Sequence, residues 1–407
     1  MSEQAVVSEE PSVSEEPSGS EQASGSEQDL SRLVTDLVAD RAEAWDRAGR
    51  LPADVIRSLA KAGALSPQIP AEFGGRNWSS GRAGEFTAHV GALCSSTRSL
   101  MTSQGMAAWT VQRLGGADQR SEILTRLASG SVAAVAFSEP AAGSDLAAIQ
   151  TRIERSGDTV RINGAKTWIT GAAYADLIVV FGRNGNGNGN GNGNGNGNGN
   201  GNGGAAVVVP ATAPGVTVTT VPDPLGCRAA GHADVRFDDV EVPADQLLSA
   251  AGSPLEWLVT SALTYGRLSV AWGCVGILRA CLRATTAHAR TRNQFGVPLA
   301  EHQLVGRHLA ELYVAEQAAT ALCESASGAW DAGRSDLVSA AVAAKHFAAT
   351  SAARGAASAV QVLASAGAHD GHPVARAYRD AKLMEVIEGS NEISQLVLAR
   401  QAVSQWS

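Results

Sequence analysis

The sequence predicts an α+β protein in which a β-rich region lies between two helical regions. The first observation is the period of the apolar residues, which recur three or four positions apart near both ends of the chain and alternate in its middle. The second is the length, since 407 residues exceed what one simple core needs and fit two or three packed units. We therefore expect successive helical, β and helical domains.

The first part of the chain divides into a tail and a helical domain. Residues 1–28 are mostly Ser, Glu, Pro, Gly and Gln. Such a segment cannot offset the entropy of its own ordering, so a disordered acidic tail is expected. Residues 29–131 are expected to be helical, because LSRLVTDLVADRAEAW and LPADVIRSLAKAGAL are amphipathic and Gly63 closes the second string.

The middle part, residues 132–250, reads as a β domain. TVRINGAKTWIT alternates around Asn163-Gly164, and short β-branched runs lie on either side of ten Asn-Gly repeats in residues 184–203. One Asn-Gly pair favours a hairpin turn, whereas ten in tandem are expected to form a flexible polar loop. We interpret this loop as an insertion tolerated between two strands.

The last part, residues 251–407, is expected to be a helical bundle. HQLVGRHLAELYVAEQAATALCESA keeps one face apolar, and few Pro or Gly interrupt the Ala-rich stretches that follow. Long Ala-rich helices favour close packing, within the chain and against another subunit.

Composition argues against several function classes. A net charge of -8 without a Lys/Arg cluster argues against nucleic-acid binding. No secretory signal is evident, and no stretch was expected to approach the roughly 20 apolar residues of a membrane-spanning helix, so a cytoplasmic protein is predicted. The five cysteines are widely spread without CxxC spacing, which predicts neither a zinc site nor a redox dithiol, and no metal is expected.

Five segments could carry chemistry, although each also has an ordinary structural interpretation. FSEPAAGSD (137–145) is a connection whose small residues admit a ligand, and in KTWIT (166–170) an indole beside a hydroxyl can flank a flat ring. RTRNQFG (290–296) offers an arginine fork for a phosphate, and QVLASAG (361–367) opens space beside a helix. Glu388, in MEVIEGSNEI, has apolar neighbours; a carboxylate in a dry pocket has a raised pKa and can act as a general base.

The order of these segments resembles the motif set of the acyl-CoA dehydrogenase family over about residues 30–404. AGALSPQIPAEFGG also looks like a motif of the family's N-terminal domain. The resemblance implies an N-terminal helical domain, a middle β-barrel and a C-terminal four-helix bundle. It also implies a homodimer or homotetramer with FAD bound in each subunit.

The resemblance implies cofactor-binding roles in four groups. Residues implied beside the isoalloxazine ring are Phe137, Ser138, Trp168 and Thr170, and those implied near the FAD phosphates and the pantetheine arm are Gly143 and Ser144. Residues implied to reach the FAD of a neighbouring subunit are Arg292, Gln294, Phe295, Gln361 and Gly367. The residues implied to contact FAD after Glu388 are Ser390 and Glu392; at the position of Ser390 the family more often has Thr.

Glu388 matches the catalytic base of most family members. Some members place the base on an earlier helix, just before an arginine that matches Arg267; here that position is Gly266, which cannot accept a proton. In the family the base removes the Cα proton of a thioester substrate while hydride leaves Cβ for flavin N5. The resemblance therefore implies Glu388 as the catalytic residue.

A narrower resemblance concerns the substrate. GCRAAGHADV, YGRLSVAWGCVGILRAC and AYRDAKLMEVIEGS look like the acyl-CoA dehydrogenase-like enzymes that make methoxymalonyl-acyl carrier protein (ACP), or the related hydroxymalonyl and aminomalonyl units, for polyketide and antibiotic biosynthesis. This implies oxidation of a three-carbon, glyceryl-derived acyl group on ACP rather than on CoA. Whether the alcohol or the aldehyde stage is oxidised stays open, as does which proton Glu388 removes.

Three alternatives remain. A catabolic acyl-CoA dehydrogenase would form a 2-enoyl-CoA and pass electrons to electron-transfer flavoprotein. A flavin monooxygenase of the same fold would use oxygen, and the carboxylate of Glu388 argues against it. A non-enzymatic protein that binds a macromolecule such as DNA would need a basic C-terminal surface, which this acidic chain lacks.

Overall fold

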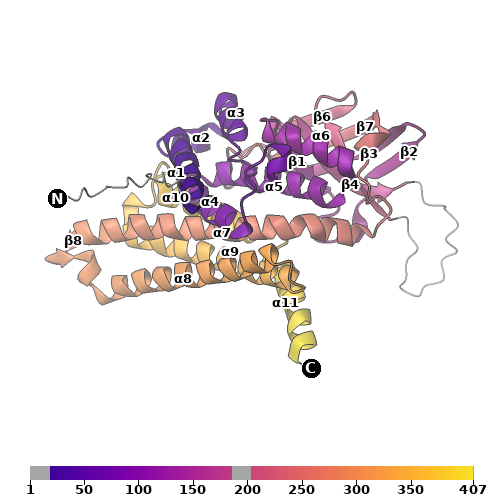
Figure 1. Ribbon diagram of the computed structural model, residues 1–407. Coiled ribbons are helices and arrows are strands. Elements are labelled where there is room, and N and C mark those ends of the chain that lie inside the picture. Colours follow the sequence, from indigo (N-terminus) through magenta and orange to yellow (C-terminus); the bar gives the residue numbers. More distant parts are fainter. Residues whose placement is uncertain (1–18, 186–202, 407) are drawn as a thin grey trace, which may run out of the picture.

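The computed structural model describes residues 19–185 and 203–406 and has the predicted helical, β and helical order (Figure 1). The N-terminal domain and the β domain lie side by side on the long helices of the C-terminal domain. The expected acidic tail lies largely outside the described residues. Helix α1 nevertheless begins at Gly19, so residues 19–28, predicted to be disordered, are helical. Glu, Gln and Ala in this stretch favour extension of the amphipathic helix that follows them.

The N-terminal domain contains six helices: α1 (Gly19–Val38), α2 (Ala42–Ala48), α3 (Ala53–Lys61), α4 (Ser80–Leu93), α5 (Ser95–Leu114) and α6 (Ala117–Ala128). Helix α5 is buried on almost every side, since it packs on α4 and α6 as well as on the C-terminal helix α7 (Leu255–Thr291) and strand β1. Helix α4 approaches α7 closely through small residues. A Cβ atom added at Gly276 of α7 would lie 2.1 Å from the carbonyl oxygen of Ala88.

The middle domain is one seven-stranded sheet. Its strands are β1 (Ala133–Ala136), β2 (Arg152–Ser156), β3 (Thr159–Ile169), β4 (Leu177–Asn184), β5 (Gly204–Pro210), β6 (Val216–Thr220) and β7 (Ala233–Pro243). The order is β1-β4-β2-β3-β7-β6, with β5 antiparallel to β4 on its other edge. All seven strands contribute side chains to one core cluster, so the sheet curves around that core as in a barrel.

The Asn-Gly repeats connect β4 to β5, which confirms that they lie between two strands. Asn184 is the last residue of β4 and Gly204 the first of β5, and the pairing of Arg183 with Gly204 closes the antiparallel register. Apart from Asn184, Gly185 and Gly203, the loop lies outside the described residues, and its predicted flexibility stays a prediction.

The C-terminal domain is a bundle of long helices. They are α7, α8 (Gln303–Asp331), α9 (Leu337–Leu363) and α10 (Pro373–Met384), followed by α11 (Asn391–Trp406). A short hairpin of β8 (Asn293–Gln294) and β9 (Val297–Pro298) joins α7 to α8. The bundle core is rich in alanine, which lets the backbones of α7, α8 and α9 approach closely.

Helix α7 corrects one expectation from the sequence. By length and composition it could cross a membrane, although no apolar stretch was expected to be that long. In the structure, 67% of its apolar window is buried inside the protein, where it packs on α4, α5, α8 and α9. Its apolar side chains therefore form part of the bundle core, as is typical of the central helix of a folded domain.

Candidate active site

Glu388 lies in the turn between α10 and α11, and the backbone of this turn is held by two cations. Both Glu388 (φ 55°) and Gly389 (φ 89°) adopt the left-handed conformation, which for a residue other than glycine costs roughly 1–2 kcal/mol. Nε of Arg267 on α7 donates to the carbonyl of Glu388 at 3.2 Å, and Nζ of Lys345 on α9 donates to that of Gly389 at 2.7 Å. Two helices distant in sequence thus stabilise the strained turn.

The carboxylate of Glu388 points into the protein between α5 and α7. Its Oε2 atom is buried without a hydrogen-bond partner. A Cβ atom added at Gly266 would lie 2.4 Å from this oxygen and 2.3 Å from Sδ of Met106. Gly266 therefore leaves the space that the carboxylate occupies, and a side chain at the alternative base position would displace Glu388.

The electrostatics of the site favour a general base that works near neutral pH. Burial raises the pKa of Glu388 to about 7, against the opposing effect of three cations, Arg267, Lys345 and Arg98. Burial in turn lowers the pKa of Lys345 to about 8. A carboxylate with a pKa near the working pH combines a useful ionised fraction with basicity, which suits proton abstraction.

The segments predicted to face the flavin are joined by hydrogen bonds. The backbone N–H of Thr167 donates to the carbonyl of Ser138 at 2.9 Å, and Nζ of Lys166 donates to that of Phe137 at 2.9 Å. The Phe137 ring packs on Phe181 at 4.6 Å between centroids. The structure thus brings the 137–138 segment against the end of β3.

A buried ion pair supports this junction. Lys166 donates to Oε1 of Glu139 at 2.8 Å, and both side chains are at most 5% exposed. Glu139 also accepts the backbone N–H groups of Gln150 at 2.6 Å and Thr151 at 2.9 Å. Burial lowers the pKa of Lys166 to about 8 although Glu139 raises it, and Lys166 helps to lower the pKa of Glu139.

Trp168 and Thr170 lie beside His232, where strand β3 is irregular. A register shift between Lys166 and Ile169 breaks the alternation of β3, and Trp168 has φ 56°. Such an irregularity re-aims a side chain, and the indole of Trp168 is 52% exposed. The ring of Trp168 lies 5.8 Å from that of His232, whose Nδ1 is 3.2 Å from the hydroxyl of Thr170.

Five residues predicted to bind FAD lie far from Glu388 in the same chain. Arg292, Gln294 and Phe295 are exposed in the hairpin at the far end of α7, and Phe295 is 95% exposed. Gln361 and Gly367 lie where α9 ends, at the same end of the bundle (Figure 1). From Gly266 to Thr291, α7 rises about 38 Å at 1.5 Å per residue. The structure therefore separates the predicted site residues into two groups.

The remaining predicted residues lie at turns. Gly143 and Ser144 are exposed in the loop after β1. Ser390 precedes α11, where its hydroxyl accepts the backbone N–H of Ile393 at 3.4 Å. The pKa of Glu392 is lowered by its own backbone N–H and by the hydroxyl of Ser390. Ser390 and Glu392 thus begin the helix that follows the proposed base.

The sequence interpretation missed Arg98, His232 and Lys345. Arg98 and Lys345 are at most 1% exposed and His232 is 7% exposed. A signal was present, since a lone arginine in the small-residue run STRSLMTS and a lone lysine in AAVAAKHFAA are unusual on helices that pack from all sides. A single charged residue in a helix is nevertheless a surface residue in most proteins, so the pattern alone did not identify them.

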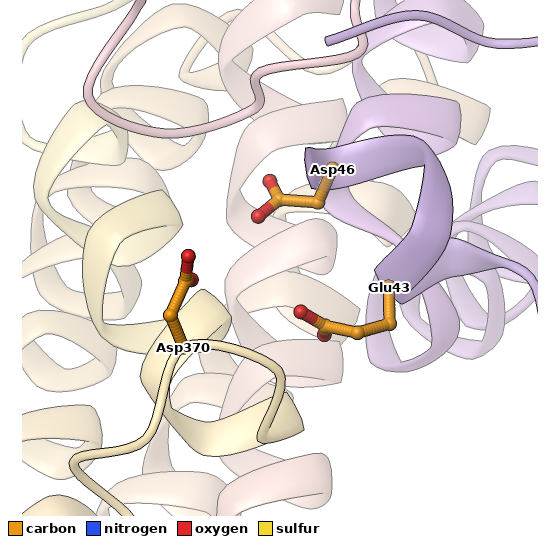
Figure 2. A group of neighbouring side chains, drawn as sticks. All are labelled: Glu43, Asp46 and Asp370. Atoms are coloured by element: carbon orange, nitrogen blue, oxygen red, sulfur yellow. The ribbon is translucent and has the colours of Figure 1, made fainter. Parts of the chain in front are cut away.

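A cluster of three carboxylates lies elsewhere, where the N-terminal domain meets the bundle (Figure 2). Glu43 and Asp46 come from α2, and Asp370 precedes α10. Arginines bind all three: Arg376 donates to Glu43 at 3.0 Å, while Arg379 donates to Asp370 at 3.1 Å and also to Asp46. We interpret the cluster as an ion-pair network that joins the two domains.

The predicted site residues fit a flavin and a thioester. The half-exposed Trp168 lies near Thr170, and the backbone of Phe137 and Ser138 bonds to residues just before them. A buried oxygen of Glu388 has no hydrogen-bond partner among the residues that the structure describes. The charge of Arg98 acts on both regions, because it lowers the pKa of both Glu388 and His232.

Comparison with known proteins identifies the family. Residues 21–131, 134–240 and 257–403 match the N-terminal, middle and C-terminal domains of acyl-CoA dehydrogenase. A probable acyl-CoA dehydrogenase, YngJ of Bacillus subtilis (strain 168), is 34% identical over 89% of this chain and 93% of its own.

Two solved structures show the same fold. FkbI, described as acting in biosynthesis of the methoxymalonyl extender unit of the polyketide Fk520, is 56% identical, with a TM-score of 0.85 over 92% of this chain and 99% of that one. Butyryl-CoA dehydrogenase of Megasphaera elsdenii is 26% identical, with a TM-score of 0.85 over 93% and 98%. The predicted architecture and FAD dependence are confirmed, and the chain belongs to the acyl-CoA dehydrogenase family.

Proposed function

We propose that this protein is an FAD-dependent acyl-ACP dehydrogenase that oxidises a three-carbon, glyceryl-derived acyl group toward the hydroxymalonyl or methoxymalonyl extender unit of a polyketide. The observation that carries the proposal is the 56% identity to FkbI over nearly the whole chain. Similarity to enzymes named for CoA thioesters is weaker, at 34% or less.

Glu388 is the proposed base. Its buried Oε2 has no hydrogen-bond partner in the described part of the chain, and its pKa is raised to about 7, so the ionised form is available near neutral pH to take a proton. Its backbone N–H is proposed to donate to the thioester carbonyl and so stabilise the developing enolate. When bound, FAD accepts the hydride. The cations Arg98, Arg267 and Lys345 provide a positive environment for negative charge that develops on the acyl group.

A homodimer or homotetramer accounts for the separation of the predicted FAD residues. Arg292, Gln294 and Phe295 lie about 38 Å along α7 from the Glu388 region, so they are proposed to complete the site of a neighbouring subunit. The 95% exposure of Phe295 is consistent with a role outside its own chain. We further propose a cytoplasmic location, with an acyl carrier protein as partner and electron-transfer flavoprotein as a candidate electron acceptor.

One experiment separates the proposal from its alternatives. The FAD-loaded enzyme is mixed anaerobically with glyceryl-ACP, with its aldehyde-stage product, and with butyryl-CoA, and loss of the flavin absorbance is followed. Bleaching by one of the ACP substrates and not by butyryl-CoA supports the proposal. Bleaching by butyryl-CoA alone shows a catabolic dehydrogenase instead.

The Glu388→Gln variant is the matched control for the base. It keeps the shape of the side chain and is expected to bind FAD normally, while bleaching slows by roughly 10²–10⁴-fold, the usual contribution of a general base. Bleaching at the wild-type rate would show that another group removes the proton.

A further inference from the structure

Arg98 of α5 is a buried cation whose partners are uncharged. It is 1% exposed. Its Nη1 donates to the hydroxyl of Thr102 at 3.1 Å and its Nη2 to Sδ of Met384 at 2.9 Å, whereas Nε is buried without a partner. A thioether is a weak acceptor. Because arginine is almost never fully buried without an ionic hydrogen-bond partner, this arrangement costs free energy.

His232 is a second buried polar residue in this region, and one of its ring nitrogens makes no hydrogen bond. It is 7% exposed, and its Nδ1 lies 3.2 Å from the hydroxyl of Thr170. Its Nε2 is buried without a partner. Burial and the charge of Arg98 lower the pKa of His232 to about 4, against the opposing effect of the Cys227 backbone carbonyl, so the ring is neutral at physiological pH. A neutral imidazole can donate or accept at Nε2, according to its tautomer.

The face of α5 between Arg98 and Glu388 is also polar. The hydroxyl of Thr102 is 2.7 Å from that of Ser269 on α7, and the hydroxyl of Ser103 donates to the carbonyl of Thr170 at 2.9 Å. Met106, one turn beyond Thr102, lies near Glu388 across Gly266. A site for a fatty acyl chain would be lined by apolar side chains. The hydroxyl groups here suit a short acyl group that carries oxygen.

We propose that Arg98 and His232 form a subsite for an oxygen atom on C2 or C3 of the substrate acyl group. Nε of Arg98 donates to a lone pair of this oxygen, and Nε2 of His232 pairs with it from the other side, accepting its hydrogen when the group is a hydroxyl. Both orphan atoms are then satisfied. This inference rests on the proposed function, because it concerns the acyl group that the enzyme oxidises.

Selectivity in the wild-type enzyme is the first test. Anaerobic flavin bleaching is compared for glyceryl-ACP and propionyl-ACP, which has the same three carbons without hydroxyl groups. The value of kcat/KM is expected to favour glyceryl-ACP by roughly 10²-fold or more, because the deoxy substrate leaves two buried polar groups unpaired. Equal values would overturn the subsite while leaving an acyl-ACP dehydrogenase in place. Oxidation of butyryl-CoA with neither ACP substrate would overturn the proposed function itself.

Variants of Arg98 separate recognition from a structural role. In Arg98→Met the preference for glyceryl-ACP is expected to fall at least tenfold toward equality. The Tm of the FAD-loaded, substrate-free enzyme is expected to stay the same or rise, because an incompletely paired buried charge is replaced by an apolar chain of similar length. A lower Tm with an unchanged preference would show that Arg98 is structural and would contradict the proposal.

Two variants of His232 provide a matched pair that does not depend on Arg98→Met folding. The amide nitrogen of Asn can replace Nδ1 and keep the contact with Thr170, whereas that of Gln can reach the position of Nε2. His232→Asn is expected to lose most of the preference for glyceryl-ACP, and His232→Gln to keep more of it. The reverse order, or no change in either, would sink the subsite.

Discussion

The carboxylate of Glu388 occupies the space that a side chain on Gly266 would need. An added Cβ at Gly266 would approach Oε2 of Glu388 to 2.4 Å and Cδ to 2.8 Å. The two positions at which members of this family place the base therefore exclude each other in this protein. A glycine on α7 is a structural requirement for the proposed base on the α10–α11 turn.

Gly266→Ala is expected to impair catalysis by moving Glu388. A contact below 3 Å must be relieved, and the carboxylate and the flexible Met106 are the groups able to shift. A displacement near 1 Å can reduce the rate roughly 10²-fold. The measurement is the rate of anaerobic flavin bleaching, with FAD content as a check on folding.

Gly328→Ala is the control for this substitution. Gly328 lies within α8 and a Cβ there meets nothing within 4 Å. Alanine in this helix is expected to be stabilising by up to about 1 kcal/mol and to leave the bleaching rate unchanged. Similar activity losses in both variants would contradict the steric argument.

The pH dependence of activity should follow Glu388. Its pKa is raised to about 7, and only the ionised carboxylate accepts a proton. The kcat/KM value is therefore expected to rise tenfold per pH unit below about 7 and to level off above it. The folded state also holds the proton of Glu388 more tightly than the unfolded state does, whose pKa is 4.5. The free energy of unfolding is therefore expected to fall as the pH rises from 4.5 to about 7, and to stay level above that. Both dependences should disappear in Glu388→Gln, and a rate independent of pH in the wild-type enzyme would contradict the assignment.

Lys345→Met tests how the turn and the base are coupled. The charge of Lys345 lowers the pKa of Glu388, so its removal is expected to shift the midpoint of the kcat/KM profile to higher pH. Its Nζ also donates to the carbonyl of Gly389, and an unpaired buried carbonyl costs about 1–3 kcal/mol, measurable by denaturant unfolding. Lys382→Met, at an exposed lysine that pairs with Glu385, should leave the midpoint in place. A shift to lower pH in Lys345→Met would refute the electrostatic argument.

Lys166→Met should weaken FAD binding from a distance. It leaves Glu139 as a buried carboxylate without its cation, which costs about 3–5 kcal/mol, and it removes the donor to the Phe137 carbonyl. Loss of bound FAD on dilution and a lower Tm are the measurements. The double variant Lys166→Met/Glu139→Gln is expected to recover part of the stability, because the unpaired charge is gone. No recovery would indicate that the pair acts through the lysine alone.

Much of the fold could be predicted because it depends on local sequence patterns. The helical and alternating spacing of apolar residues predicted the order of the three domains. Residues 184–203 were expected between two strands, and they connect β4 to β5. The beginning of α1 at Gly19 was missed, because the polar composition of residues 19–28 resembles that of a disordered tail. These residues are helical as an extension of the amphipathic segment that follows them. The length of the apolar stretch in α7 was also underestimated. Many of its residues are small, and whether a small residue is buried depends on the neighbouring helices.

The sequence by itself determined the family and pointed to Glu388, because the order of several weak motifs is far more specific than any one of them. Only the tertiary structure decided what surrounds that carboxylate. Arg267 and Lys345 hold its turn, Gly266 makes room for it, and Arg98 and His232 keep unused hydrogen-bonding atoms nearby. Whether a buried polar atom has a partner depends on segments far apart in the chain. A local pattern contains no information about that pairing, so such atoms are found only once the chain is folded.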